Sequence, residues 1–218
     1  MERPVNRSYK LRGARATLAQ EAAYEKLWPT FGIEPVGTID PAVIFPNSSK
    51  RIMEIGTGMG EATAKIVAAF PETGFFAVEV HVPGIGALMN LATANGSTNL
   101  RIIEEDAHMV LAHNIPDKSL DAIHLFFPDP WPKARHWKRR IVQQSFLELI
   151  HPKIVDGGYI QIATDWVEYA EWMQRVFAES TLFEGGVIER PEWRPISKFE
   201  GQGLRKGHIV TDMKYYKK

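Results

Sequence analysis

From Arg51 onward, short apolar segments typical of β-strands alternate with segments that have helical spacing. Strands are predicted at residues 51–55, 75–80, 100–103, 122–127 and 158–163, and helices at 61–70, 83–94, 107–113, 138–150 and 166–179. This alternation is typical of an α/β fold in which helices cover both faces of a mostly parallel, doubly wound sheet. Two further strands, near 182–189 and 207–216, are predicted to form an antiparallel hairpin at the C-terminal edge of the sheet.

The first 48 residues lack this regular pattern. Residues 1–15 contain five Lys or Arg and one acid, and we expect them to form a basic arm. Residues 16–28 are predicted to form a short helix that ends before Pro29, because the residue preceding a proline disfavours the helical conformation. Residues 29–48 are rich in Pro, Gly and Asn, so we expect a surface connection. The chain therefore divides into an arm with a connecting segment, 1–48, and a folded domain, 49–218.

The composition excludes several classes of protein. The chain contains no cysteine, so disulfides and thiolate metal sites are excluded, and the spacing of His108, His113 and His136 does not suggest a metal site. The sequence shows neither a signal-peptide pattern nor an apolar run long enough to cross a membrane. We therefore expect a cytoplasmic protein that does not bind membranes.

Acidic residues lie at the carboxyl ends of five predicted strands. They are Glu54, Glu79, Asp106, Asp129 and Asp165. In open parallel sheets, ligands bind beyond the carboxyl ends of the strands, so these side chains are expected to meet in one cleft. Any one of them could instead cap a helix or form a turn, but that explanation accounts poorly for all five.

A glycine-rich turn follows the first strand and indicates a nucleotide-like cofactor. Its glycines are Gly56, Gly58 and Gly60, and they stand between two acids, Glu54 and Glu61. Dinucleotide-binding loops have the pattern G-x-G-x-x-G and receive a pyrophosphate, which flanking carboxylates would repel. The acids favour S-adenosylmethionine, which carries a sulfonium and an amino group but no phosphate. A dinucleotide and a turn without any ligand remain the alternatives.

Two later strand ends provide further candidate contacts to this cofactor. Glu79 lies about 20 residues after the glycine turn, the distance at which an acid binds ribose hydroxyls in related folds. Asp106 could accept a hydrogen bond from the adenine amino group, and the backbone of Ala107 could complete the contact with the base edge.

Asp129 is the candidate catalytic residue, because Pro128 and Pro130 restrict the backbone on either side of it. A fixed carboxylate can offset the positive charge that passes to a methyl acceptor and can hold an N–H edge in place. A ring nitrogen such as guanine N7 has a free lone pair and needs no general base. This fits a site that shows no evident pair of residues for activating a nucleophile. A loop-capping role for Asp129 is the alternative.

The residues after Asp129 indicate an RNA partner, although the formal net charge of the chain is zero. Residues 133–140 contain five Lys or Arg and no acid, and Trp131 and Trp137 accompany them. Interleaved aromatic and cationic side chains can stack on bases and bind phosphates. Trp131 could equally pack beneath the loop, and the cations could form an ordinary solvated surface. Asp165 is expected to face the same cleft, over which Lys198 and Glu200 could fold.

These motifs together resemble the bacterial tRNA (guanine-N7-)-methyltransferase family, which modifies a guanosine in the tRNA variable loop. The most specific stretch is Phe127-Pro128-Asp129-Pro130-Trp131-Pro132-Lys133-Ala134-Arg135-His136, continuing through Lys138-Arg139-Arg140. It is supported by the glycine turn, Glu79, Asp106, Ala163-Thr164-Asp165-Trp166 and Ser197-Lys198-Phe199-Glu200. The resemblance runs from about residue 50 to the C-terminus. It implies a Rossmann-like class I methyltransferase fold, with S-adenosylmethionine as cofactor and tRNA as partner.

The resemblance also implies roles for particular residues. Glu54, Glu79, Asp106 and Asp129 are similar to the acids that contact the cofactor, and Asp129 also to the active-site residue. The implied substrate-binding residues are Lys133, Arg135, His136, Lys138, Arg139, Arg140, Asp165, Ser197, Lys198, Phe199 and Glu200. The chain departs from the family pattern at Ala134, at Ser197 and at residues 201–203, which puts RNA affinity rather than chemistry in question.

Two other functions remain open at this point. One is a methyltransferase that acts on another RNA base, on a small molecule or on a protein. The other is a nucleic-acid binder that has kept a degenerate cofactor fold, which the acids at the strand ends disfavour. The sequence leaves monomer and homodimer equally open.

Overall fold

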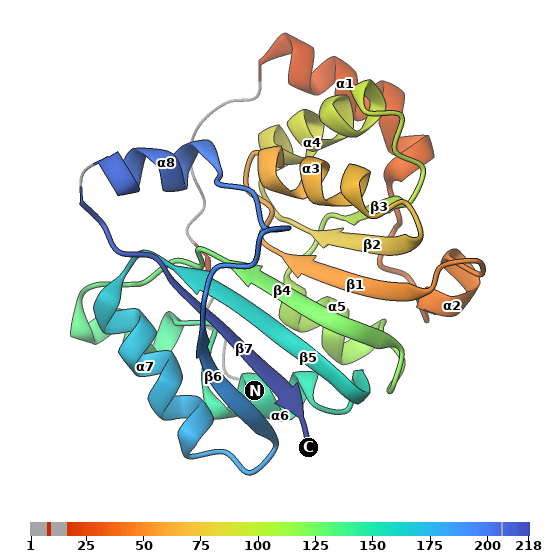
Figure 1. Ribbon diagram of the computed structural model, residues 1–218. Coiled ribbons are helices and arrows are strands. Elements are labelled where there is room, and N and C mark those ends of the chain that lie inside the picture. Colours follow the sequence, from red (N-terminus) through yellow and green to blue (C-terminus); the bar gives the residue numbers. More distant parts are fainter. Residues whose placement is uncertain (1–7, 10–16, 206) are drawn as a thin grey trace.

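A seven-stranded sheet forms the centre of the computed structural model, which describes residues 8–9, 17–205 and 207–218 without the side chains of Ala19, Lys198 and Phe199. The strand order is β3-β2-β1-β4-β5-β7-β6 (Figure 1). The strands are β1 (Lys50–Ile55), β2 (Thr73–Val78), β3 (Leu100–Ile103), β4 (Leu120–Phe126), β5 (Ile154–Thr164), β6 (Phe183–Ile188) and β7 (Thr211–Lys217). β1 to β5 pair in parallel, whereas β7 pairs antiparallel with both β5 and β6. The predicted α/β fold with an antiparallel C-terminal edge is confirmed.

Helices cover both faces of this sheet, as Figure 1 shows. The helices of the described residues are α1 (Leu18–Phe31), α2 (Pro41–Ile44), α3 (Glu61–Ala69), α4 (Val82–Ala94), α5 (Ala107–His113), the 3-10 helix η1 (Ala134–Arg139), α6 (Gln144–Ile150), α7 (Val167–Ala178) and α8 (Lys198–Arg205). α1, α3 and α4 pack together over one face, and α5, α6 and α7 over the other. Each layer buries its own apolar core against the strands. No helix in the described part of the chain is long and apolar enough to cross a membrane.

Two predicted helices differ from those observed. α1 continues past Pro29 to Phe31, because the buried ring of Phe31 packs into the core and stabilises the last turn. The helix predicted over residues 138–150 begins only at Gln144, since the backbone of Arg140 leaves the helical conformation and ends η1. The basic segment is therefore a separate short helix and not the first turn of α6.

The segment predicted as a surface connection contributes to the core. Ile39 and Phe45 are buried, and the Phe45 ring meets the Phe76 ring edge to face at 5.0 Å. The backbone N–H of Ile39 donates to the carbonyl of Asn114, and that of Ile33 donates to the carbonyl of Ile102. The predicted basic arm, residues 1–15, lies outside the described residues except for Ser8 and Tyr9.

Candidate active site

The parallel register brings the carboxyl ends of β1 to β5 to one edge of the sheet (Figure 1). The five acids predicted from the sequence lie at or just after these ends. The structure therefore brings the five acids to one end of the parallel strands, as the sequence predicted.

The glycine turn leaves open space where a ligand would lie. Gly56, Gly58 and Gly60 all have positive φ angles, a conformation that favours glycine. A Cβ atom built on Gly56 or Gly58 would meet nothing within 4 Å, whereas one on Gly60 would lie 2.6 Å from the Cβ of Leu88. The first two glycines thus border open space, and the third allows the start of α3 to pack closely against α4.

Glu54 supplies a buried carboxylate beside this turn. One oxygen, Oε1, accepts a hydrogen bond from the Thr63 hydroxyl at 2.9 Å. The other, Oε2, is buried and has no hydrogen-bond partner among the described residues. Burial raises the pKa of Glu54 to about 7, against the opposing effect of the Thr63 hydrogen bond. A buried acceptor without a partner is suited to a ligand that brings a donor or a positive charge.

Glu79 holds the glycine turn in place. Its Oε2 accepts from the backbone N–H of Gly58 at 2.8 Å, and its Oε1 accepts from the N–H groups of Val80 and His81. A carboxylate oxygen can accept more than one hydrogen bond, so Oε2 can also receive a ligand hydroxyl. The carboxylate is thus oriented toward the glycine turn by three backbone donors.

Asp106 acts as a helix cap in this structure. Its Oδ1 accepts from the backbone N–H of His108 at 2.9 Å, and Ala107 forms the first residue of α5. The capping role considered as an alternative is therefore present for Asp106. The hydrogen bond from His108 orients the Asp106 carboxylate near the end of β3, where the contact with an adenine amino group was predicted.

The loop around Asp129 has an unusual backbone conformation. Phe127 and Trp131, on either side of Pro128–Pro130, have φ angles of 53° and 45°. Such angles are costly for large side chains and persist only where the surroundings enforce them. Here the N–H of Phe127 donates to the carbonyl of Ala163, and the indole N–H of Trp131 donates to the carbonyl of Ser8.

Trp131 packs within the fold, which decides between the two roles considered for it. It is 9% exposed, and the guanidinium carbon of Arg139 lies 3.9 Å from its ring centroid. Trp137 is more exposed and contacts the ring of Trp172 at 5.7 Å. Trp131 therefore anchors the loop, and Trp137 keeps an exposed surface beside the basic residues.

The predicted RNA-binding residues of η1 do not all face solvent. Lys133, Arg135 and Lys138 are exposed, and His136 is half-buried, with its pKa lowered by burial and by the neighbouring cations. Arg140 is only 2% exposed, which contradicts its predicted role on the RNA-binding surface. A charged residue in a basic run is usually solvated, but the sequence cannot show that aromatic rings surround this one.

Arg140 instead links the Asp129 loop to a cluster of aromatic side chains. Its guanidinium lies 4.8 to 5.2 Å from the ring centroids of Trp137, Tyr169 and Trp172. Its Nε donates to the carbonyl of Pro130 at 2.9 Å. This contact ties the residue after Asp129 to the aromatic cluster formed with α7.

The late segment Ser197–Glu200 begins α8 rather than forming an open loop. The Ser197 hydroxyl accepts from the N–H of Glu200, and Glu200 Oε2 accepts from the N–H of Ser197, an S-x-x-E capping box. Glu200 is 1% exposed and pairs with Arg194, so the carboxylate predicted to contact substrate points into the protein. The side chains of Lys198 and Phe199 lie outside the described part of the chain.

Asp165 lies at the end of β5 and contacts the chain that follows α8. Its Oδ2 lies 3.1 Å from Nδ1 of His208. Sequence reasoning missed both His208 and Arg194. The S-x-x-E pattern could have indicated that Glu200 belongs to a helix start, but the sequence carries no local signal for the partner of its carboxylate.

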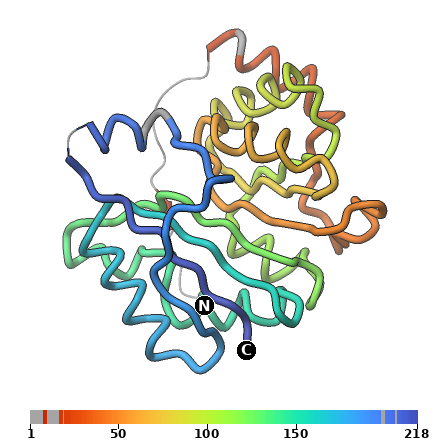
Figure 2. Tube along the Cα trace, in the orientation of Figure 1, coloured from red at the N-terminus to blue at the C-terminus, as the bar shows by residue number. Residues whose placement is uncertain are grey.

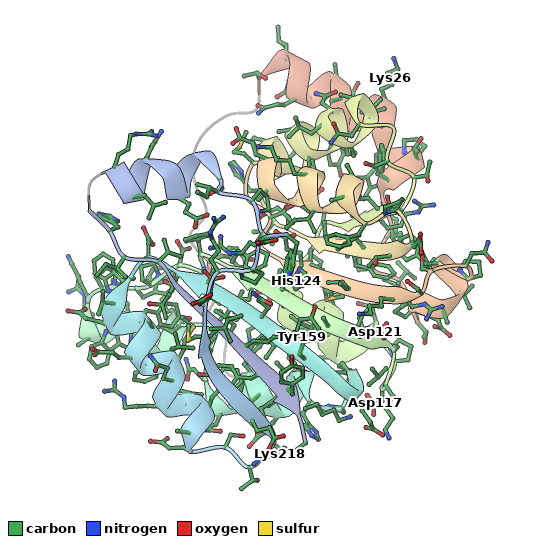
Figure 3. All side chains as sticks on the ribbon, in the orientation of Figure 1. Lys26, Asp117, Asp121, His124, Tyr159 and Lys218 are labelled. Atoms are coloured by element: carbon green, nitrogen blue, oxygen red, sulfur yellow. The ribbon has the colours of Figure 1, made fainter. Side chains whose placement is uncertain are left out.

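A separate hollow of about 460 Å³ is lined by none of these candidate residues. His124, Tyr159 and Trp193 line it together with Lys50, at the amino end of β1, and Figure 3 shows His124 and Tyr159 on the sheet. Burial lowers the pKa of His124 to about 3, so its ring is neutral. Because ligands in this type of sheet bind at the opposite strand ends, we do not assign the active site to this hollow.

Solved structures of similar fold are methyltransferases. The 16S rRNA methyltransferase KamB has a TM-score of 0.56 at 16% identity, covering 80% of this chain and 91% of that one. Phosphoethanolamine N-methyltransferase 2 of Haemonchus contortus, in complex with S-adenosyl-L-methionine, has a TM-score of 0.50 at 10% identity, covering 90% and 56%. The sheet order and the glycine turn are those of the Rossmann-like class I methyltransferase fold.

The sequence comparisons identify the family more closely. A family described as putative methyltransferase matches residues 48–213. The tRNA (guanine-N(7)-)-methyltransferase of Nitrosospira multiformis is 46% identical over 220 residues, which cover 99% of this chain and 96% of the relative. The chain belongs to the tRNA (guanine-N(7)-)-methyltransferase family.

Proposed function

We propose that this protein transfers a methyl group from S-adenosylmethionine to N7 of a guanosine in the variable loop of tRNA. The observation that carries the proposal is the loop holding Asp129 next to the exposed cations of η1, in a chain of this family. Acidic and cationic groups on adjoining segments can serve two parts of one substrate, the reacting base and the phosphates. We further propose that the reaction takes place in the cytoplasm.

The residues at the strand ends fit the proposed cofactor. Oε2 of Glu54, buried without a partner among the described residues, can accept from the amino group of the methionine part. The open space beside Gly56 and Gly58 allows a ligand to approach the backbone closely. Glu79 and Asp106 would hold the ribose hydroxyls and the adenine edge. When bound, the cofactor supplies a methyl group attached to a positively charged sulfur.

Asp129 would perform the main electrostatic task in the reaction. Guanine N7 has a free lone pair, so the base needs no deprotonation before it is methylated. The guanine ring becomes positively charged as the N–C bond forms, and a carboxylate fixed nearby stabilises that charge. Asp129 can also accept hydrogen bonds from the N–H groups of guanine and hold N7 in line with the methyl group.

The exposed residues Lys133, Arg135 and Lys138 would bind the phosphates of the tRNA. Such contacts fix the position of the RNA without reading its sequence. Asp165 lies at the neighbouring strand end and would contact the substrate base. Arg139 and His136 both pack against the ring of Trp131. They would therefore hold η1 in position as well as contact the RNA.

The direct test is to incubate the purified protein with radiolabelled S-adenosylmethionine and unmodified tRNA. Digestion and chromatography should place the label in 7-methylguanosine, at one position of the variable loop. A matched tRNA with adenosine at that position should remain unlabelled. Label in another nucleoside, or transfer to the adenosine variant, would contradict the proposed acceptor. Transfer to a small molecule with no transfer to tRNA would favour the other class of methyltransferase.

A further inference from the structure

We propose that Arg194 is a positioning residue that fixes α8 relative to the Asp129 loop and so orders the surface that receives the tRNA. The proposal rests on the proposed function, because it concerns how that substrate is held. Arg194 lies in the long connection between β6 and β7, and Figure 2 shows this connection leaving the sheet, forming α8 and returning to the start of β7.

Arg194 forms a fully buried ion triad with Glu200 and Asp212. Its Nη1 and Nη2 donate to the two oxygens of Glu200 at 2.8 and 2.9 Å. Its Nε and Nη2 donate to the two oxygens of Asp212, both at 2.8 Å. The three residues are 1 to 3% exposed. Such fork-like pairing fixes both distance and direction, so α8 is tied to the first residues of β7.

The same carboxylate of Glu200 also starts α8. Its Oε2, which receives Nη1 of Arg194, lies 3.4 Å from the N–H of Ser197 in the capping box. The Ser197 hydroxyl completes the box by accepting from the N–H of Glu200 at 3.1 Å. Arg194 therefore sets the place where α8 begins as well as its attachment to the sheet.

Arg194 also contacts the residues that lead into the Asp129 loop. Its guanidinium carbon lies 5.8 and 5.7 Å from the ring centroids of Phe126 and Phe127. Phe127 is one of the two residues in the loop with positive φ, so a cation against its ring helps to keep it in that conformation. The side chain of Arg194 thus contacts the Asp129 loop, α8 and β7.

The far end of α8 returns to another predicted substrate residue. Gly203 lies against His208 and Asp165, since a Cβ built on it would be 3.3 Å from His208 Nδ1 and 3.4 Å from Asp165 Oδ2. α8 therefore spans from the triad to the carboxylate at the end of β5. If its start moved, the Asp165–His208 contact would move with it.

Stability alone does not explain a triad of this kind. Buried ion networks can often be replaced by apolar residues of similar volume without loss of stability, because the ions lose their hydration on burial. What apolar residues cannot reproduce is the fixed geometry of four hydrogen bonds. The triad is therefore suited to orientation, and its removal should affect substrate binding more than folding.

The test compares two variants of the full chain. Arg194→Lys keeps the positive charge but loses the fork of donors that pairs with both carboxylates. The triple variant Arg194→Met, Glu200→Leu, Asp212→Leu replaces all three charges with apolar groups. Asp156→Asn is the control, because Asp156 is an exposed carboxylate at the opposite end of β5, where it pairs with Lys118 and Lys217, and asparagine keeps an oxygen that can accept from Lys217.

We expect the triple variant to melt near the wild-type temperature while kcat/KM for tRNA falls about 10²-fold, as for a misplaced binding surface. Arg194→Lys should show the same loss in kcat/KM for tRNA, and both should bind S-adenosylmethionine as the wild type does. Hydrogen exchange over residues 197–208 should rise in both variants. Asp156→Asn should match the wild type in every measurement.

Wild-type kcat/KM and wild-type exchange in the triple variant would overturn the proposal, because α8 would then keep its position without the triad. Equal loss of cofactor and tRNA binding in Arg194→Lys would also contradict it. The exchange measurement needs no substrate. If the wild type failed to methylate tRNA but α8 loosened in the variants, the proposed function would fail while the positioning role of Arg194 stood.

Discussion

At the scale of single residues, the site depends on how carboxylates are held. Glu79 and Asp106 are oriented by backbone N–H groups, whereas Glu54 keeps a buried oxygen without a partner among the described residues. Asp129 lies between two residues with positive φ. These differences predict different consequences when each acid is replaced.

Asp129→Ala is expected to lower kcat by about 10² to 10³-fold, the usual cost of removing a group that stabilises transition-state charge. The affinity for tRNA, measured by filter binding, should change little, because we propose that the phosphates contact η1 and not Asp129. Asp129→Asn should keep the loop conformation and lose the charge. Activity of the asparagine variant equal to that of the wild type would exclude a charge-stabilising role.

The affinity for S-adenosylmethionine is expected to fall as the pH drops below about 7. Burial raises the pKa of Glu54 to about 7, so below that pH the carboxyl is neutral and cannot pair with an amino cation. Above that pH the carboxylate is charged, and the affinity should reach a plateau. Isothermal titration calorimetry from pH 5.5 to 8.5 would measure this.

Glu54→Gln is the matched control for this pH dependence. The amide has a similar shape but does not titrate, so its affinity should be weaker at pH 7.5 by about 1.5 to 3 kcal/mol, the value of a hydrogen bond to a charged group. The affinity of this variant should also vary less with pH. Parallel pH profiles for the two proteins would show that another group titrates.

At the scale of elements, the basic residues in and directly after η1 look alike in the sequence but differ in burial: Arg135 and Lys138 are exposed, whereas Arg140 is buried. Replacing the exposed pair Arg135 and Lys138 with Ala should weaken tRNA binding and reduce its dependence on salt. Each phosphate contact contributes about 0.7 to 0.9 to the slope of log K against log salt, so the slope should fall by about 1.5. Binding titrations at four salt concentrations would show this, and an unchanged slope would exclude both residues from the interface.

Arg140→Ala, directly after η1, should act on stability instead. The change removes the buried guanidinium from its aromatic cluster and leaves the carbonyl of Pro130 without its donor. A buried polar group without its partner costs about 1 to 3 kcal/mol of unfolding free energy. Urea denaturation would measure the loss. A large fall in the salt slope with no loss of stability would restore Arg140 to the RNA surface.

Sequence periodicity predicted where most strands and helices lie, because a strand in a parallel sheet is a short apolar run whatever surrounds it. Periodicity failed where contacts between residues far apart in the sequence determine a helix end or the burial of a side chain. Pro29 was expected to end α1, yet burial of Phe31 carries the helix past it. Arg140 and Glu200 were expected to contact the substrate, but both side chains are buried. Their burial depends on Tyr169, Trp172 and Arg194, whose proximity no local pattern encodes.

At the scale of the whole molecule, residues 17–48 fold as part of the methyltransferase domain in this structure, so a protein that begins at residue 49 is expected to lose most of its stability. The shortened chain would expose the surfaces that Phe31, Ile39 and Phe45 now cover. Burial of a large apolar side chain contributes about 1.5 to 3 kcal/mol, so the three together contribute roughly 5 to 9 kcal/mol. Domains are stable by only about 5 to 15 kcal/mol.

The measurement is thermal unfolding of the full and the shortened chain, followed by circular dichroism and by tryptophan fluorescence. The full chain should unfold in one transition, because α1 packs on α4 and the Phe45 ring lies on Gly74 and Phe76. S-adenosylmethionine at about 100 times its Kd should add about 2.7 kcal/mol to the stability of the full chain. A shortened chain that unfolds cooperatively at the wild-type temperature, with the same response to the cofactor, would show that the domain begins at residue 49.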